Sequence, residues 1–97
     1  MIYLGTNDVN FVDDDRVARC VGRLVEVVRR CDAEVLVVCP PPFDGHELGP
    51  SFATELDCPL LDLDGIATYP VVGEDLEHLD ADGHAAVAKA IAERLLA

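Results

Sequence analysis

Residues 34–42 read Glu-Val-Leu-Val-Val-Cys-Pro-Pro-Pro, and no other stretch of the chain constrains its architecture as strongly. The continuous apolar, β-branched run is typical of a strand that is buried on both faces, as in a parallel sheet. The three prolines end this strand, because proline has no backbone N–H for a ladder or helix. We therefore expect a buried strand over 34–39 and a loop at its carboxyl end.

The residues before this strand predict a first strand and a helix. Residues 1–4 form a short apolar run that ends at Gly5, as a buried strand would. Three aspartates at 13–15 supply acceptors and negative charge where a helix begins. From Arg16 onward the apolar side chains recur with a helical period, with arginines on the other face. The members of this apolar set are Val17, Cys20, Val21, Leu24, Val25, Val28 and Cys31.

The residues after the prolines are less regular. Residues 51–56 predict one or two helical turns, residues 60–63 a third short strand, and residues 64–79 a loop. Asp80 is placed to cap a helix over 81–95. Alternating strands and helices are typical of a parallel α/β sheet. We therefore expect one domain over 1–97, with a short parallel sheet of about three strands flanked by helices.

The charge balance restricts the possible partners. The chain has 19 acidic and 7 basic residues, a net charge of −12, and its single lysine is Lys89. Such a surface repels nucleic acid and anionic membranes, so we expect neither as a partner. An acidic, lysine-poor chain indicates a halophilic protein, and an ordinary acidic protein is the alternative. We see no signal peptide and no apolar run of ~18–20 residues, so we expect a cytoplasmic location.

The four cysteines show no metal or redox spacing. Cys20, Cys31, Cys39 and Cys58 form no C-x-x-C pair and no zinc-ligand pattern. Cys20 and Cys31 fall on the apolar side of the expected helix, and Cys39 ends the expected strand. Buried free thiols explain all four, and we expect no cofactor.

Polar residues gather at the expected carboxyl ends of the strands, where ligands of open α/β sheets bind. Asn7 and Asp8 follow the first strand, and Asp75 and His78 lie in the loop before the last helix. An aspartate three residues before a histidine can set a carboxylate against the imidazole, as in a Ser-His-Asp triad. Taken singly, Asn7-Asp8 is better explained as a turn.

Three segments together resemble one enzyme family. Gly5-Thr6-Asn7-Asp8 resembles the Gly-x-Asn-Asp block of the SGNH (GDSL-type) ester hydrolases, and Asp75-x-x-His78 resembles their final catalytic block. The strand that ends in residues 38–42 is similar to the fourth strand of that family and the loop leaving it. The order of these segments along the chain matches as well.

The resemblance implies a flavodoxin-like three-layer fold and a Ser-His-Asp mechanism acting on a small ester substrate. His78 would be the general base, and Asp75 would orient it. The Asn7 amide would donate into the oxyanion hole, and Asp8, together with Gly5, would support the Asn7 loop.

Two blocks of that family are absent. Its Gly-Asp-Ser nucleophile and a glycine oxyanion donor both precede the asparagine block. The chain therefore resembles the carboxyl-terminal half of the fold, truncated at its amino-terminal side and inactive alone. The only serine, Ser51, follows Gly-Pro rather than a strand and is a poor nucleophile candidate.

Two other functions stay open. His78, Asp80, Asp82 and His84 alternate as possible ligands of a metal in a small acidic metal-binding protein, although a helix start at Asp80 would separate them. Alternatively, the chain is a non-catalytic binding or scaffolding remnant that self-associates or pairs with a complementing amino-terminal segment through an exposed strand. We expect His46 to be a solvated loop side chain, and His84 to pack or cap.

Overall fold

The structure, a computed structural model, describes residues 1–43, 45–70 and 78–97. Within these residues the chain forms a small α/β protein with a three-strand parallel sheet and three α-helices. The elements in chain order are β1 (Ile2–Tyr3), the 3₁₀ turn η1 (Asp8–Asn10), α1 (Asp14–Arg29), β2 (Val37–Cys39), α2 (Leu48–Glu55), β3 (Leu60–Asp62) and α3 (Ala81–Leu96).

The sheet has the strand order β1-β2-β3, with both neighbours parallel to β2. Val37 pairs with Ile2 on one side and with Leu60 on the other. The predicted strand over 34–39 is confirmed in its second half. Pairing reaches one residue further back, because the Ile2 N–H donates to the Leu36 carbonyl at 2.8 Å. Because the strands are parallel, their carboxyl ends share one edge of the sheet.

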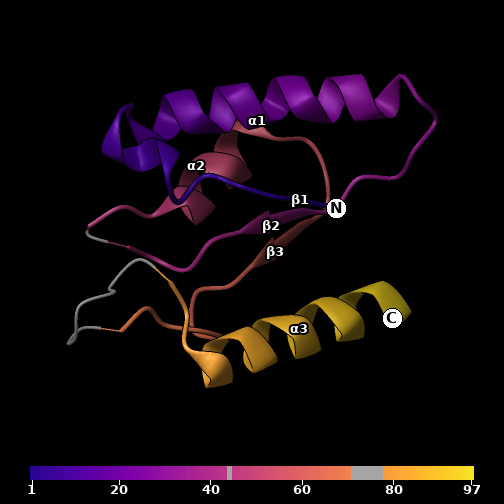
Figure 1. Ribbon diagram of the computed structural model, residues 1–97. Coiled ribbons are helices and arrows are strands. Elements are labelled where there is room, and N and C mark those ends of the chain that lie inside the picture. Colours follow the sequence, from indigo (N-terminus) through magenta and orange to yellow (C-terminus); the bar gives the residue numbers. More distant parts are fainter. Residues whose placement is uncertain (44, 71–77) are drawn as a thin grey trace.

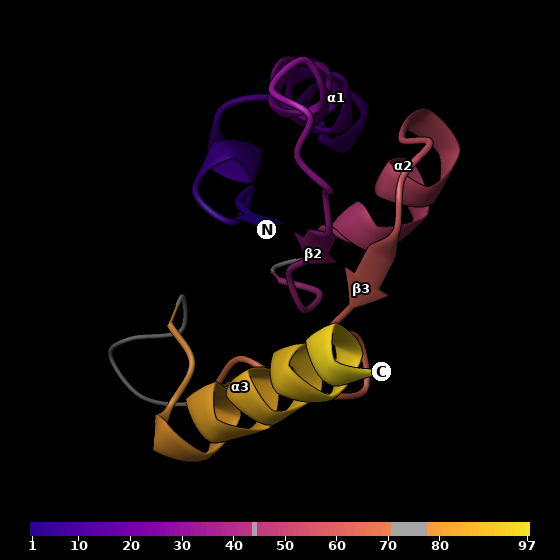
Figure 2. The same cartoon turned by 90° about the vertical axis from the view of Figure 1, so that its right-hand side faces the viewer.

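Helices cover both faces of the sheet. Figures 1 and 2 show α1 and α2 on one face and α3 on the other. The side chains of β2 alternate between two cores, as expected for a strand of period two. Val37 and Cys39 lie in the core under α1 and α2, and Leu36 and Val38 lie in the core facing α3. A strand buried on both faces explains the continuous apolar run.

Aspartates start both long helices, as predicted. The Asp13 carboxylate accepts from the Arg16 N–H at 2.8 Å, and the Asp80 carboxylate accepts from the Gly83 N–H at 2.7 Å. Each bond satisfies one of the amide groups that a first helical turn leaves unpaired. The helix predicted over 51–56 begins earlier, at Leu48, because the buried Leu48 and Phe52 form its inner face.

Two of the expected buried thiols are exposed. Cys39 is buried as predicted, but the prediction for Cys20 and Cys31 is wrong. The apolar band of α1 is wider than the face that packs on the sheet. Val21 and Val25 fill that face, whereas Cys20 lies on its flank and Cys31 lies in the turn after the helix.

The helices of the described residues give no candidate membrane span. None of them is both long enough and apolar enough to cross a bilayer.

Gly5 allows the loop after β1 to pass closely over α2. Its φ is +125°, in a region that side chains with a Cβ rarely adopt. A Cβ at this position would lie 2.6 Å from Leu48 Cδ1 and 3.5 Å from Val17 Cγ1. The glycine therefore serves both the backbone conformation and the packing under the Asn7 loop.

We expect Gly5→Ala to lower the free energy of unfolding by about 2–4 kcal/mol, because overpacking adds to backbone strain. Gly65→Ala is the matched control. Gly65 has a φ of +78° and open space within 4 Å of the place where a Cβ would lie, so only backbone strain of about 1 kcal/mol applies. Urea unfolding of both variants measures the difference. Equal losses would contradict the packing role of Gly5.

Candidate functional site

The loops that follow the three strands are joined at the carboxyl edge of the sheet. Thr6 Oγ1 follows β1 and lies 3.0 Å from the Tyr69 hydroxyl, which follows β3. The Tyr69 ring meets the ring of Phe43, which follows β2, edge to face with centroids 5.3 Å apart. Tyr69 is buried, so this aromatic residue ties the three loops together. Figure 1 shows the loops after β1 and β2 and the start of α3 on the same side of the molecule.

Sequence reasoning missed Tyr69. The available signal was that Tyr69 is the only Phe, Tyr or Trp between residues 64 and 79. Its neighbour Tyr3 also belongs to this edge. Burial raises the pKa of the Tyr3 phenol, and the nearby Tyr69 phenol raises it further.

The loop over residues 5–8 presents Asn7 outward. The Asp8 and Val9 amides both donate to the Gly5 carbonyl, at 3.0 and 3.3 Å, and Val9 is buried beneath the turn. Asn7 opens the 3₁₀ turn, yet in this described segment its side chain makes no capping hydrogen bond. It is exposed, beside a shallow hollow of about 200 Å³ that residues 3–8 line. The Asn7 amide is thus available to a ligand on an anchored loop.

His78 lies at the start of the last helix. It is exposed and comes two residues before Asp80, the N-cap of α3. Asp75 lies outside the described residues, and so does the predicted pairing of its carboxylate with the imidazole. Of the expected Asp75–His78 pair, the structure therefore describes His78 alone.

Ser51 lies in α2 and is half-buried. Its hydroxyl donates to the Asp15 carboxylate at 3.1 Å, which joins α2 to the first turn of α1. This hydrogen bond gives the only serine of the chain a packing role between two helices.

His46 is more than a solvated loop residue, and that expectation is wrong. Its Nδ1 lies 2.9 Å from Asp14 Oδ1, and the next backbone amide, of Glu47, donates to Asp14 Oδ2 at 3.2 Å. Its own backbone exchanges two hydrogen bonds with Phe43. These contacts hold the loop after β2 against the beginning of α1.

The described residues do not bring together a set of side chains that could bind a metal ion. Outside residues 44 and 71–77, no three His, Cys, Asp or Glu side chains converge as a metal would need. Asp80, one of the suggested ligands, already uses Oδ1 as a helix cap.

The surroundings of Cys39, the buried thiol of β2, disfavour the reactive thiolate. Burial raises the pKa of Cys39 to about 12, and the neighbouring Asp62 and Cys58 add to the shift. Burial also raises the pKa of Cys58, which is half-exposed. Since the thiolate is the nucleophile, Cys39 is a packing residue.

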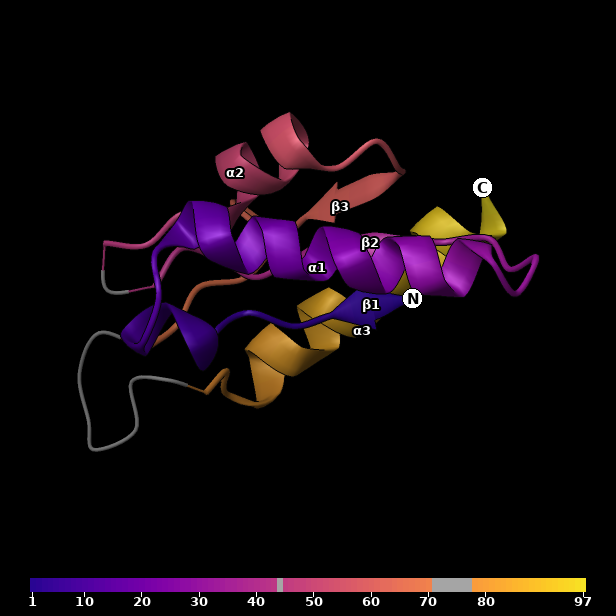
Figure 3. The same ribbon diagram turned by 90° about the horizontal axis from the view of Figure 1, so that it is seen from above.

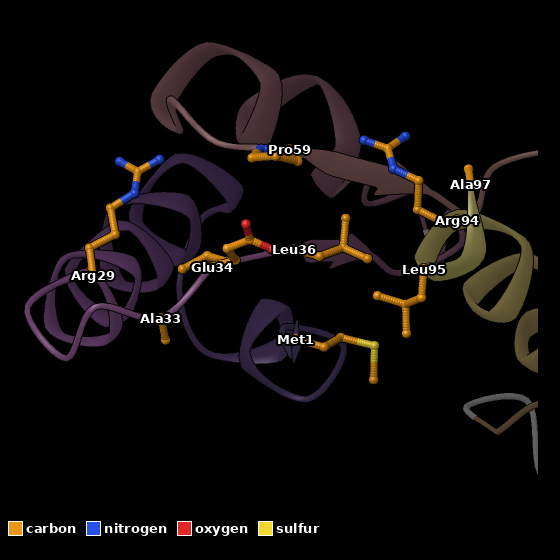
Figure 4. A pocket seen from close by; sticks show the side chains of 10 residues that line it. Met1, Arg29, Ala33, Glu34, Leu36, Pro59, Arg94, Leu95 and Ala97 are labelled. Atoms are coloured by element: carbon orange, nitrogen blue, oxygen red, sulfur yellow. The ribbon is translucent and has the colours of Figure 1, made fainter.

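A larger hollow, of about 700 Å³, lies at the opposite end of the sheet (Figure 4). It is lined by residues at the amino ends of β1 and β2 and at the end of α3, with Arg29 and Arg94 at its sides. Among the described residues that line it there is no serine, histidine or cysteine. It is larger than the hollow beside Asn7, and it lies at the other end of the sheet from Asn7 and His78.

Comparison of this chain with protein-family models, with curated proteins and with solved structures finds no match.

The environments of the thiols predict a graded reaction with a disulfide reagent at pH 8. We expect Cys20 and Cys31 to react rapidly, and Cys39 to react only after unfolding, because roughly one part in ten thousand is thiolate at that pH. Mass spectrometry of the modified peptides locates the label. Cys39→Ala serves as control and should remove only the slowest phase. Rapid labelling of Cys39 in the folded chain would refute its burial.

Because Thr6 and Tyr69 share a hydrogen bond, we expect substitutions at these two residues to have coupled effects on the free energy of unfolding. Tyr69→Phe keeps the contact with Phe43 and removes the hydroxyl, so we expect a loss of about 0.5–1.5 kcal/mol in unfolding free energy. Thr6→Val should cost a similar amount, and the double variant little more than either. Denaturant unfolding of the four proteins measures the cycle. Strictly additive losses would show that the two hydroxyls do not interact.

Proposed function

We propose that this chain carries the acid–base and oxyanion part of an SGNH (GDSL-type) ester-hydrolase site on part of a flavodoxin-like fold. In this proposal the serine nucleophile belongs to a segment outside the chain. The observation that carries it is the exposed Asn7 amide, held on an anchored loop at the carboxyl edge of a parallel sheet. This is the edge at which open α/β sheets bind their ligands.

The arrangement of the loops after the three strands supports the same proposed function. The loops after β1, β2 and β3 meet through Thr6, Phe43 and Tyr69, so groups on these loops can act on one substrate. His78 lies three residues before α3 begins, and the first turn of α3 lies on the same side of the molecule as the loops after β1 and β2. β1 is an edge strand in the described sheet, so one of its sides pairs with no described strand.

The proposed reaction is acyl transfer through a covalent intermediate. The external serine Oγ attacks the ester carbonyl while His78 accepts its proton, and His78 then returns that proton to the leaving alcohol. Asp75 holds the imidazole in the required tautomer. The Asn7 amide donates to the oxyanion of each tetrahedral intermediate. Water activated by His78 finally hydrolyses the acyl-serine, which restores the free serine hydroxyl.

The supporting residues act through the Asn7 loop. Gly5 lets the loop lie against Leu48, and Tyr69 holds the loop through Thr6. Asp8 begins the 3₁₀ turn, where its negative charge suits the exposed amides. None of these residues exchanges protons with the substrate in the proposed reaction.

The test uses a fluorophosphonate probe and p-nitrophenyl acetate. The chain alone should neither react with the probe nor hydrolyse the ester. If in-frame DNA upstream of Met1 encodes a Gly-Asp-Ser strand and turn, the extended protein should do both. In that protein we expect Asn7→Ala to lower kcat by about 10²–10³-fold and His78→Ala to abolish probe labelling.

His84→Ala is the matched control, because His84 is an exposed histidine in the first turn of α3. It should leave kcat and labelling unchanged. Labelling of the chain alone at Ser51 that His78→Ala removes would contradict an external nucleophile. Activity of the extended protein that survives both Asn7→Ala and His78→Ala would reject the proposed site.

A further inference from the structure

A second apolar stripe runs along α1 and onto Cys31, which lies in the turn after the helix, and this stripe is exposed. Cys20, Leu24, Val27 and Cys31 are spaced four, three and four residues apart, and all four are exposed. Leu24 is 43% and Val27 55% exposed. Alternating steps of four and three residues form the seam of a coiled coil, where each side chain enters a facing helix. The stripe therefore has the geometry to receive one more helix.

The stripe faces the open side of the sheet. A groove of about 230 Å³ separates α1 from the segment after β1, and it is lined by Cys20 and Leu24 on one side and by Leu4 and Val12 on the other. The helix α2 packs on the opposite flank of α1, where Leu56 contacts Gly22. Figure 3 shows β1 and α2 on opposite sides of α1. The exposed stripe and the unpaired edge of β1 therefore belong to one surface.

A row of arginines borders the stripe. Arg16, Arg23 and Arg30 follow each other at intervals of seven residues and are all exposed. With Arg19 and Arg29, this one helical segment holds five of the seven basic residues of a chain whose net charge is −12. Arg23 and Arg30 directly precede the stripe residues Leu24 and Cys31, so the row lies at the position that flanks a coiled-coil seam. Charges at such positions select the partner helix.

We propose that the stripe of α1 and its arginine row form a docking site for an amphipathic helix of another polypeptide, one with acidic residues beside its apolar seam. A second copy of α1 fits poorly. In a symmetric antiparallel pair, like flanks face each other, so two arginine rows would meet and repel. The inference goes beyond ester hydrolysis, because none of these side chains belongs to the Asn7 and His78 site.

The probe is a designed helical peptide of about three heptads, with leucine at both seam positions and glutamate at the flanking positions. A peptide with lysine in place of every glutamate is its control. Fluorescence anisotropy should show binding of the glutamate peptide to the chain, at least about tenfold tighter than binding of the lysine peptide.

Three variants locate the site. The double substitution Leu24→Glu with Val27→Glu should abolish binding of the glutamate peptide. The triple reversal Arg16→Glu, Arg23→Glu and Arg30→Glu should transfer the preference to the lysine peptide. Leu96→Glu, at an 87% exposed position on α3, should change nothing. Circular dichroism confirms that each variant is folded, which is expected because every substituted side chain is exposed.

A readout on the unsubstituted chain completes the test. The bound glutamate peptide should slow alkylation of Cys20 and leave that of Cys58, which lies between α2 and β3 and outside the stripe, unchanged. Equal binding of the two peptides, or no binding of either, would overturn the proposal. So would dimerisation of the chain in sedimentation experiments that Leu24→Glu abolishes, because the occupant would then be a second copy.

Discussion

The parallel pairing of β1 and β3 with β2 is the interaction on which the rest of the structure depends. Val37, Val38 and Cys39 are almost fully buried, and each of the two apolar cores contains side chains from this strand. Burying one such valine contributes about 1.5–3 kcal/mol, which is large for so short a chain. The same pairing brings the three loops to one edge, so the position of the candidate site follows from β2.

The candidate site is organised by packing more than by hydrogen bonds between catalytic groups. Gly5 brings the Asn7 loop onto Leu48, Val9 anchors it, and Tyr69 connects it with the loops after the other two strands. The exposed Asn7 side chain is left out of these contacts. A donor held by its neighbours but unused by them suits an oxyanion, since little reorganisation is then needed on binding.

Two features leave one side of the described sheet uncovered. β1 is an edge strand of two residues, and the flank of α1 beside it exposes leucine, valine and cysteine next to arginines. Unpaired edges and contiguous apolar patches are usually covered in stable proteins. The ester-hydrolase proposal and the docking proposal place missing elements at this same side of the sheet, from independent observations.

The sequence by itself determined the α/β class, the three strands, the helix starts at residues 13–15 and at Asp80, and the burial of Cys39. These features depend on local patterning: continuous apolar runs, helical periodicity and the bonds of short acidic side chains to nearby amides. The site residues Asn7 and His78 were likewise named from motifs, and their joint chemistry remains a prediction.

Only the tertiary structure decided which apolar positions are covered. Cys20 and Cys31 share the helical period of Val21 and Val25, yet both are exposed, and periodicity cannot show which neighbours are present. The Tyr69 link to Thr6 and the His46 link to Asp14 join residues 63 and 32 positions apart. Such contacts arise from the folding of distant segments onto one sheet, which no local pattern contains.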